Sequence, residues 1–220
     1  VSRYGDVEAL AQKTRDAFGA VDLLFNNAGV LLPSGSIWES SLNDWMWIMG
    51  VNLWGAIHGT LAFVPMMLAQ NTECHVVFTA SSAGLTAASV IGPYGVTKHG
   101  IVSLAETLHL QLAERGANIH VSVLCPGYAN TRLWNAERNR PRELQDMPST
   151  VQVNADSEPM KARLRPLFDE GMPPGQVADS VLDAIRDEEF YILVSPDTKA
   201  AVRERMENIL QDHIPGKNLT

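Results

Sequence analysis

Residues 75–84 read HVVFTASSAG, an apolar run of strand length followed by small polar residues and a glycine. Short apolar runs bounded by turn residues are typical of buried strands. Similar runs recur along the chain, and segments with helical periodicity separate them. Strands that alternate with helices predict a parallel sheet covered on both faces, which is a doubly wound, Rossmann-like α/β fold. The other expected strands are VDLLFNNAG at 21–29, NIHVSVLC at 118–125 and FYILVSP at 190–196.

The remaining chain is mostly helical in pattern, and its 220 residues suit one domain, 1–220. Residues 128–172 are different, because they contain four prolines and scattered charges. Long irregular excursions beside a site usually act as lids. We therefore expect 128–172 to form a mobile lid over a substrate. Helices are expected at 6–19, 41–70, about 93–115, 174–187 and 198–213.

Composition and charge argue against several classes of protein. The net charge is −8 and no strong cluster of lysine and arginine occurs, which argues against nucleic-acid binding. The arginines within 132–142 are expected to lie on a solvated loop. No uninterrupted apolar stretch reaches the ~20 residues of a membrane span, so no membrane association is expected. The spacing of the histidines does not suit a metal site, and none is expected.

The two cysteines, Cys74 and Cys125, are too few for a disulfide framework. Each adjoins an apolar strand-like run, so we expect both to be small buried hydrophobic residues. Cys74 begins one expected strand and Cys125 ends another, which places them at opposite edges of the sheet. They are not expected to pair, and this usage fits a reducing, cytoplasmic location.

The polar residues that follow the expected strands indicate one site. Ligands of doubly wound sheets bind at the carboxyl ends of the strands, and residues 26–29, 81–82 and 126–127 each follow a strand. Tyr94 opens the helix that leaves the same rim, and Lys98 lies one turn further on. Two residues four apart share a helical face. A buried ammonium beside a phenol would lower the pKa of the tyrosine and suit it to proton transfer.

Five short motifs carry a resemblance to a known family. They are NNAG at 26–29, VNLWG at 51–55, TASSAG at 79–84, YGVTK at 94–98 and PGYANT at 126–131. The residues of these motifs and their order along the chain resemble those of the classical short-chain dehydrogenase/reductase family. The resemblance covers residues 1 to about 196. The resemblance implies an oxidoreductase that moves hydride between NAD or NADP and a carbonyl or secondary alcohol.

The resemblance also implies roles for four residues. Tyr94 would exchange a proton with the substrate oxygen, and Lys98 would hold down the pKa of Tyr94 and bind the nicotinamide ribose. A serine hydroxyl would donate to the substrate oxygen; we favour Ser81 over Ser82 because Ser81 has the family spacing of 13 residues to Tyr94. Asn52 would distort its helix and hold a water that relays protons to Lys98.

The substrate, the assembly and the residues that contact the cofactor are further expectations. The substrate is expected to be a small hydrophobic ketone or alcohol, because apolar residues give segments 83–93 and 128–172 an apolar character beside the expected site, namely Leu85, Val90, Ile91, Tyr128, Leu133 and Trp134. A homodimer or homotetramer is the expected assembly. The expected cofactor contacts are Asn27, Ala28 and Gly29 near the adenine, Tyr94 and Lys98 at the ribose, and Pro126, Gly127, Ala129 and Thr131 at the nicotinamide.

One family feature is missing from the 220 residues. The glycine-rich loop that cradles the cofactor's diphosphate does not occur, so the fold is expected to be truncated at its N-terminus by about two strand–helix units of ~30 residues each. We therefore expect weak binding of either dinucleotide and no turnover by these residues alone. The alternative is a non-catalytic fragment or interaction subunit on the same fold. An epimerase or dehydratase of the extended family is a third possibility, which NNAG and PGYANT argue against.

Overall fold

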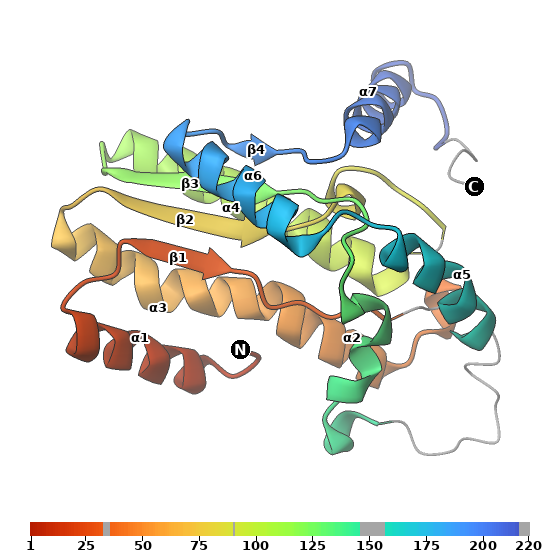
Figure 1. Cartoon of the computed structure of the whole chain (residues 1–220), viewed down its shortest axis with the longest axis horizontal. Helices are drawn as coiled ribbons and strands as arrows, with labels where there is room; N and C mark the ends of the chain where they lie inside the picture. The colour runs from red at the N-terminus through yellow and green to blue at the C-terminus, as the bar shows by residue number, and fades with distance from the viewer. Residues whose placement is uncertain (33–35, 90, 146–156, 216–220) are drawn as a thin grey trace.

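A parallel four-stranded sheet forms the centre of the molecule (Figure 1). The computed structural model describes residues 1–32, 36–89, 91–145 and 157–215. The strands lie side by side in chain order, with Leu24 opposite Val76 and Val76 opposite Val121. This arrangement confirms the predicted doubly wound α/β fold. The strands are β1 (Leu23–Asn26), β2 (Cys74–Thr79), β3 (Ile119–Leu124) and β4 (Tyr191–Ile192).

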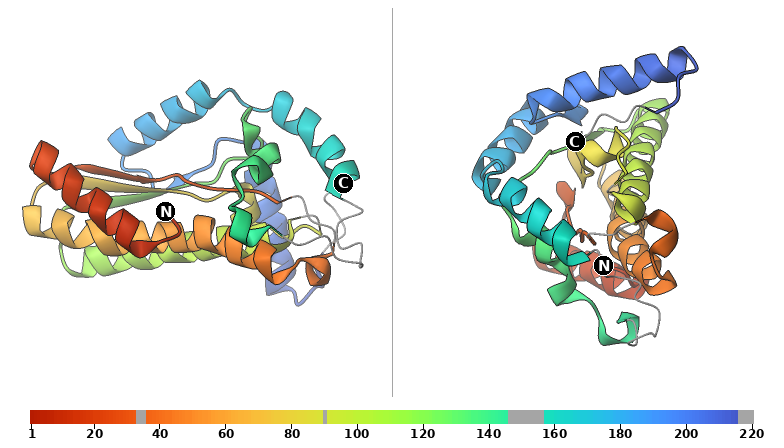
Figure 2. Two further views of the ribbon diagram at one scale, coloured as in Figure 1. Left: turned by 90° about the horizontal axis from the view of Figure 1, so that it is seen from below. Right: turned by 90° about the vertical axis from the view of Figure 1, so that its right-hand side faces the viewer.

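Helices cover the two faces of the sheet unequally (Figure 2). On one face α3 packs against β1, α4 packs against β2 and β3, and α1 packs on the outside of α3. On the other face α6 contacts β3 and β4. The helices are α1 (Tyr4–Phe18), α2 (Leu42–Ile48), α3 (Gly55–Gln70), α4 (Gly92–Glu114), α5 (Ser157–Asp169), α6 (Pro174–Arg186) and α7 (Pro196–Leu210).

The main core lies between the sheet and the α3–α4 layer. Val76, Phe78 and Val123 of the inner strands and Met67 of α3 are wholly buried there. Because β2 has neighbours on both sides and is covered on both faces, its residues are almost all buried. Both cysteines are buried free thiols, as the sequence predicted.

Strand β1 departs from the expectation of a fully buried strand. Leu24 is buried, whereas Leu23 and Phe25 are 47% and 40% exposed. The reason is that β1 is an edge strand of the described sheet, and only its α3 side is covered. Side chains of a strand alternate between the two faces, so every second residue of β1 meets open space. At the end of the strand, Asn26 Nδ2 is buried without a hydrogen-bond partner among the described residues.

The expected long helix at 41–70 consists of α2, a π-helical segment over Met49–Trp54, and α3. Ser41 caps its start in a capping box with Asp44. The span Leu42–Gln70 is long and apolar enough on average to cross a membrane, although polar residues such as Asp44 and Asn52 interrupt it, as expected. Half of its most apolar window is buried inside the protein, where α3 packs against α1 and β1. The structure thus makes it a core helix.

The excursion at 128–172 is fixed at its base. The backbone N–H of Asn130 donates to the carbonyl of Met172 at 2.9 Å, and the N–H of Met172 donates to Tyr128 at 3.0 Å. Between these ends the chain forms a 3-10 helix over Arg132–Asn139, a short turn over Arg142–Leu144, and α5. The middle of the expected lid, residues 146–156, lies outside the described residues.

Candidate active site

A cavity of about 930 Å³ opens at the carboxyl ends of the strands. It lies where the polar residues after β1, β2 and β3 were predicted to meet. Every predicted site residue lines it except Asn52, which is buried behind the cavity wall. The predicted residues that line the cavity are Asn27, Ala28, Gly29, Ser81, Tyr94, Lys98, Pro126, Gly127, Ala129 and Thr131.

Tyr94 and Lys98 lie in the first turns of α4, which begins at Gly92 with Pro93 in its first turn. Both side chains are buried, with Tyr94 8% and Lys98 3% exposed as residues. The Lys98 Nζ lies 5.4 Å from the centre of the Tyr94 ring. Lys98 donates a hydrogen bond of 2.8 Å to the carbonyl of Thr79, at the end of β2. The helix therefore presents both groups to the sheet edge.

Burial controls the protonation of this pair. It raises the pKa of the Tyr94 phenol to about 12, an effect that a hydrogen bond with the Ser81 side chain partly opposes. It lowers the pKa of the Lys98 ammonium to about 8. The pKa of Tyr94 is thus raised, not lowered as the sequence led us to expect, and desolvation of the phenol is the main cause. At neutral pH Tyr94 is thus a neutral phenol and Lys98 is still mostly charged.

The two candidate serines occupy different environments. The Ser81 hydroxyl lines the cavity, accepts from the N–H of Ala83 at 3.1 Å and lies 3.5 Å from the carbonyl of Pro126. Ser82 starts a 3-10 turn, and its carbonyl accepts the Thr86 hydroxyl at 3.0 Å. Among the described residues that line the cavity, Ser81 is present and Ser82 is not. The geometry therefore places Ser81 in the cavity that Tyr94 lines, and the catalytic role of Ser81 stays a prediction.

Asn52 lies in the π-helical segment, so the predicted distortion of its helix is present. A π-helical segment shifts the backbone hydrogen bonds by one residue and is frequent at functional sites. The Asn52 side chain accepts from the N–H of Val30 at 2.7 Å and donates to the carbonyl of Val30 at 2.9 Å. It also donates to the Thr97 hydroxyl at 3.1 Å. Both amide hydrogens are used, so the water-holding role stays a prediction.

Thr97 is a site residue that the sequence reasoning missed. It is wholly buried and its hydroxyl donates to the carbonyl of Tyr94 at 2.7 Å while accepting from Asn52. It therefore joins the π-helical segment to the turn of α4 that carries Tyr94. Its place inside YGVTK showed that it lies beside the pair, but a buried hydroxyl can find several partners, and the sequence does not say which.

Gly84 is required by the close approach of its loop to α4. A Cβ at this position would lie 2.6 Å from the backbone oxygen of Lys98. No side chain fits in that space, and the neighbouring atom is backbone, which cannot easily give way. The glycine of TASSAG thus lets the serine loop pack directly on the turn of α4 that ends at Lys98.

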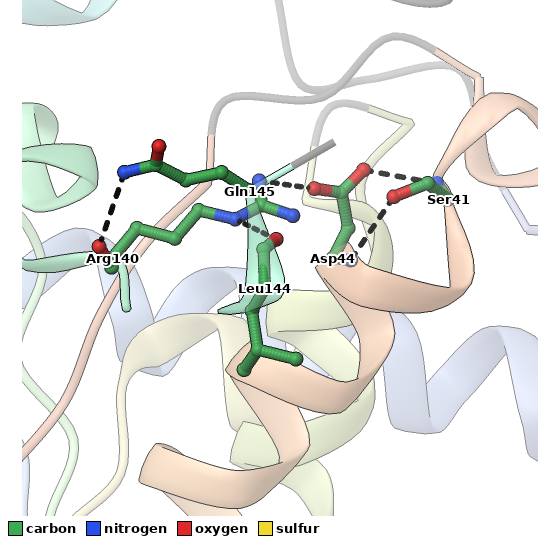
Figure 3. A network of polar contacts seen from close by, with 5 residues as sticks. All are labelled: Ser41, Asp44, Arg140, Leu144 and Gln145. Carbon is green, nitrogen blue, oxygen red and sulfur yellow. Dashed lines mark hydrogen bonds and ion pairs between the residues drawn. The ribbon is translucent and has the colours of Figure 1, made fainter. Parts of the chain in front are cut away.

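A buried ion pair attaches the excursion to the start of α2 (Figure 3). Arg140 Nη1 lies 2.6 Å from Asp44 Oδ1, and their side chains are 8% and 1% exposed. Arg140 Nε also donates to the carbonyl of Leu144 at 2.7 Å, and the guanidinium lies over Trp47. The prediction of a solvated loop is wrong for Arg140, because a carboxylate 96 residues away in sequence neutralises it inside the fold.

Cys125 lies beside the pair but is not suited to nucleophilic chemistry. It is fully buried, and burial raises the pKa of its thiol to about 12. The thiolate is the reactive form of cysteine. Burial thus leaves Cys125 as a neutral thiol at neutral pH.

Comparisons with known proteins agree with this geometry. Residues 1–142 match the family described as short chain dehydrogenase. The chain is 30% identical to the CLA biosynthesis dehydrogenase/reductase of Lactiplantibacillus plantarum, over 98% of this chain and 75% of that protein. It is 27% identical to the C alpha-dehydrogenase of Sphingobium sp., over 93% of this chain and 65% of that protein.

A solved structure is similar throughout. A short chain dehydrogenase/reductase from Burkholderia phymatum, in complex with NAD, superposes with a TM-score of 0.94 at 40% identity. The match covers 100% of this chain and 77% of that one. The fold and the cavity define an α/β protein with a tyrosine–lysine site at the carboxyl edge of its sheet. The chain belongs to the short-chain dehydrogenase family. It spans between 65% and 77% of the length of these three relatives.

Proposed function

We propose that this protein is an oxidoreductase that moves a hydride between a nicotinamide dinucleotide, NAD or NADP, and a carbonyl compound or secondary alcohol. The observation that carries the proposal is the meeting of Tyr94, Lys98 and Ser81 in one cavity. Membership of the family supports the reaction type. The NAD bound to the Burkholderia phymatum protein supports the class of cofactor.

The small residues and the Lys98 ammonium of the cavity wall support the binding of such a cofactor. Ala28, Gly29 and Gly127 have small or no side chains, which allows a planar ring or a ribose to approach the backbone. A Cβ on Gly29 would lie 3.6 Å from Lys98 Nζ, within the space beside the ammonium. Asn27 to Gly29 would hold the adenine end, Lys98 the ribose, and Pro126 to Thr131 the nicotinamide. When bound, the nicotinamide supplies or accepts the hydride.

Tyr94 is the proposed proton donor in carbonyl reduction. Its pKa of about 12 keeps it protonated at neutral pH, so it can give a proton to an oxygen that gains negative charge. Ser81 would donate a hydrogen bond to the same oxygen, which strengthens as the charge develops. Lys98 would stabilise the phenolate that forms, and Asn52 and Thr97 would keep the turn of α4 in place. These residues together support Tyr–Lys–Ser–Asn chemistry.

The walls around Tyr94 support a hydrophobic ketone or alcohol as substrate. A cluster of buried apolar side chains surrounds the phenol, and α5 contributes two of them. Burial of apolar substrate surface against such walls contributes roughly 25 cal/mol per Å². The lid role of residues 128–172, the homodimer or homotetramer, and the cytoplasmic location are proposals that accompany this function. The cluster comprises Leu31, Ala83, Tyr94, Leu164 and Phe168, with Ile91, Leu133 and Trp134 against it.

The test is direct detection of hydride transfer. The gene product, with any residues encoded upstream, is incubated with NAD or NADP cofactor carrying deuterium at C4 of the reduced ring and a panel of ketones. We expect deuterium at the carbinol carbon of the alcohol product, detected by mass spectrometry. Tight cofactor binding without deuterium transfer to any ketone, and without oxidation of the matching alcohols, would instead favour the non-catalytic interaction subunit.

A further inference from the structure

The cavity is positively charged although the protein is acidic. Three basic residues line it, namely Lys98, Arg132 and Arg138. Among the described residues of its lining there is no aspartate or glutamate. The chain as a whole carries a net charge of −8. The sign of charge in the cavity is thus opposite to that of the molecule, and a cleft lined by one sign of charge concentrates ligands of the opposite sign.

The arginines of the excursion differ in whether an acidic side chain neutralises their charge. Arg140 is neutralised by Asp44 and buried. Arg132 and Arg138 are exposed, and neither forms an ion pair within the part of the chain that the structure describes. Arg140 therefore attaches the excursion to α2, whereas Arg132 and Arg138 line the cavity.

Arg138 is oriented by the backbone around it. Its Nη1 donates to the carbonyl of Arg132 at 2.8 Å and to the carbonyl of Asn135. A guanidinium has five N–H donors on three nitrogens. The donors on Nε and Nη2 make no hydrogen bond with the described residues, so they are available to a ligand. Held in this way, the group loses less conformational entropy when a ligand binds.

The central cation of the cavity, Lys98, also forms no ion pair within the described part of the chain. Lys98 is buried, and among the described residues its ammonium donates a hydrogen bond to the neutral carbonyl of Thr79. Its ammonium keeps a pKa of about 8, lowered by desolvation. An anion in the cavity would favour the charged form of Lys98.

We propose that Arg132 and Arg138 form an anion-binding subsite in the wall of this cavity, with the planar, bidentate geometry that suits phosphate and carboxylate oxygens. The anionic group comes from one of two sources, the diphosphate of the cofactor or a carboxylate on the substrate. The choice between these sources rests on the proposed function. The existence of the subsite does not, because it can be measured with a simple anion.

The first arm of the test is calorimetric titration with inorganic pyrophosphate and, separately, with NADH. It compares the wild type with Arg132→Gln, Arg138→Gln and the double variant. Arg142→Gln is the matched control, an exposed arginine of the same excursion that is not in the described lining. We expect about tenfold weaker pyrophosphate binding in each single variant, no change in the control, and weaker binding at high salt.

The second arm identifies the source of the anion. A keto acid and its methyl ester are compared by kcat/KM in the same variants. If the substrate supplies the anion, the preference for the acid over the ester falls about tenfold in Arg132→Gln. If the cofactor supplies it, the preference stays and the dissociation constant of NADH rises about tenfold instead.

Arg132→Gln is the decisive variant, because the Arg132 side chain makes no hydrogen bond with the described residues and its loss leaves the fold intact. A thermal melt checks that it folds like the wild type. Pyrophosphate, NADH and acid–ester preference all unchanged relative to Arg142→Gln would overturn the proposal. Weaker pyrophosphate binding in a gene product that, with any residues encoded upstream, neither reduces the ketones nor oxidises the matching alcohols would uphold the subsite and reject the proposed function.

Discussion

Asn52 binds the backbone of Val30 through both polar atoms of its side-chain amide, at 2.7 and 2.9 Å. The two residues lie 22 positions apart and belong to different elements, the π-helical segment and the chain that follows β1. Because Val30 comes directly after Gly29, this pair fixes the position of NNAG against Lys98. A third hydrogen bond, to Thr97, ties the same amide to α4.

Asn52→Leu should therefore destabilise the protein strongly. The substitution leaves the N–H and carbonyl of Val30 buried without partners, at a cost of about 2–4 kcal/mol. Urea denaturation measures the free energy of unfolding. Asn118→Leu is the control, since Asn118 is exposed and its side chain makes no hydrogen bond with the described residues. Equal stability of the two variants would show that the hydrogen bonds of Asn52 do not stabilise the fold by this amount.

Alanine substitutions of Ser81 and Ser82 should differ in their effect on kcat. Ser81→Ala should lower kcat by about 10²-fold, because it removes the hydroxyl beside Tyr94 that would donate to the developing charge. Ser82→Ala should change kcat little, since Ser82 contributes backbone groups to its turn. Both are measured with saturating cofactor. Greater loss in Ser82→Ala would mean that the strand register places the wrong serine at the site.

Lys98→Met should make the protein more stable while it removes activity. Burial lowers the pKa of Lys98 from 10.5 to about 8, so the charged lysine opposes folding by about 3 kcal/mol below pH 8. As pH rises from about 8 to 10.5, the lysine of the unfolded chain is still protonated while that of the folded chain is not. The penalty therefore fades over this window, and the advantage of Lys98→Met should shrink with it.

Stability curves at pH 7, 9 and 10 check this prediction. The Tyr94 phenol does not interfere below pH 10, because its raised pKa affects stability only above the ordinary value of 10.0. A Lys98→Met variant less stable than the wild type at pH 7 would mean that the hydrogen bond to Thr79 outweighs desolvation.

The buried ion pair predicts a third effect on stability. Arg140→Met leaves the Asp44 carboxylate buried without its cation and should cost about 3–5 kcal/mol. Replacing both partners, in Asp44→Leu with Arg140→Met, should recover part of the loss, because a buried pair can be exchanged for apolar groups. Arg3→Met is the control, since the Arg3–Asp6 pair is exposed and worth less than about 1 kcal/mol. Equal losses in Arg140→Met and Arg3→Met would contradict the role of the pair.

The layout of the cavity could be predicted from sequence because it depends on local patterns. Strand-length apolar runs place residues 26–29, 81 and 126–127 at one edge of a parallel sheet, and helical spacing places Tyr94 beside Lys98. These statements need no knowledge of distant contacts. The structure accordingly brings Ser81, Tyr94 and Lys98 to one cavity.

What the sequence did not predict depends on distant partners. Asp44 and Arg140 pair across 96 residues, and nothing in either local pattern indicates the other. The high pKa of Tyr94 follows from how completely the surrounding elements bury it. The half-exposed face of β1 follows from which neighbours cover the strand, which its own apolar run does not show.

The most direct test of the account is the kcat of Tyr94→Phe, measured with saturating cofactor and ketone in the gene product that includes any residues encoded upstream. Phenylalanine keeps the ring and removes only the hydroxyl. We expect kcat to fall by about 10²- to 10⁴-fold and the cofactor's dissociation constant to change by less than about threefold. A variant that binds the cofactor normally and turns over at close to the wild-type rate would contradict the assignment of Tyr94 as the proton donor.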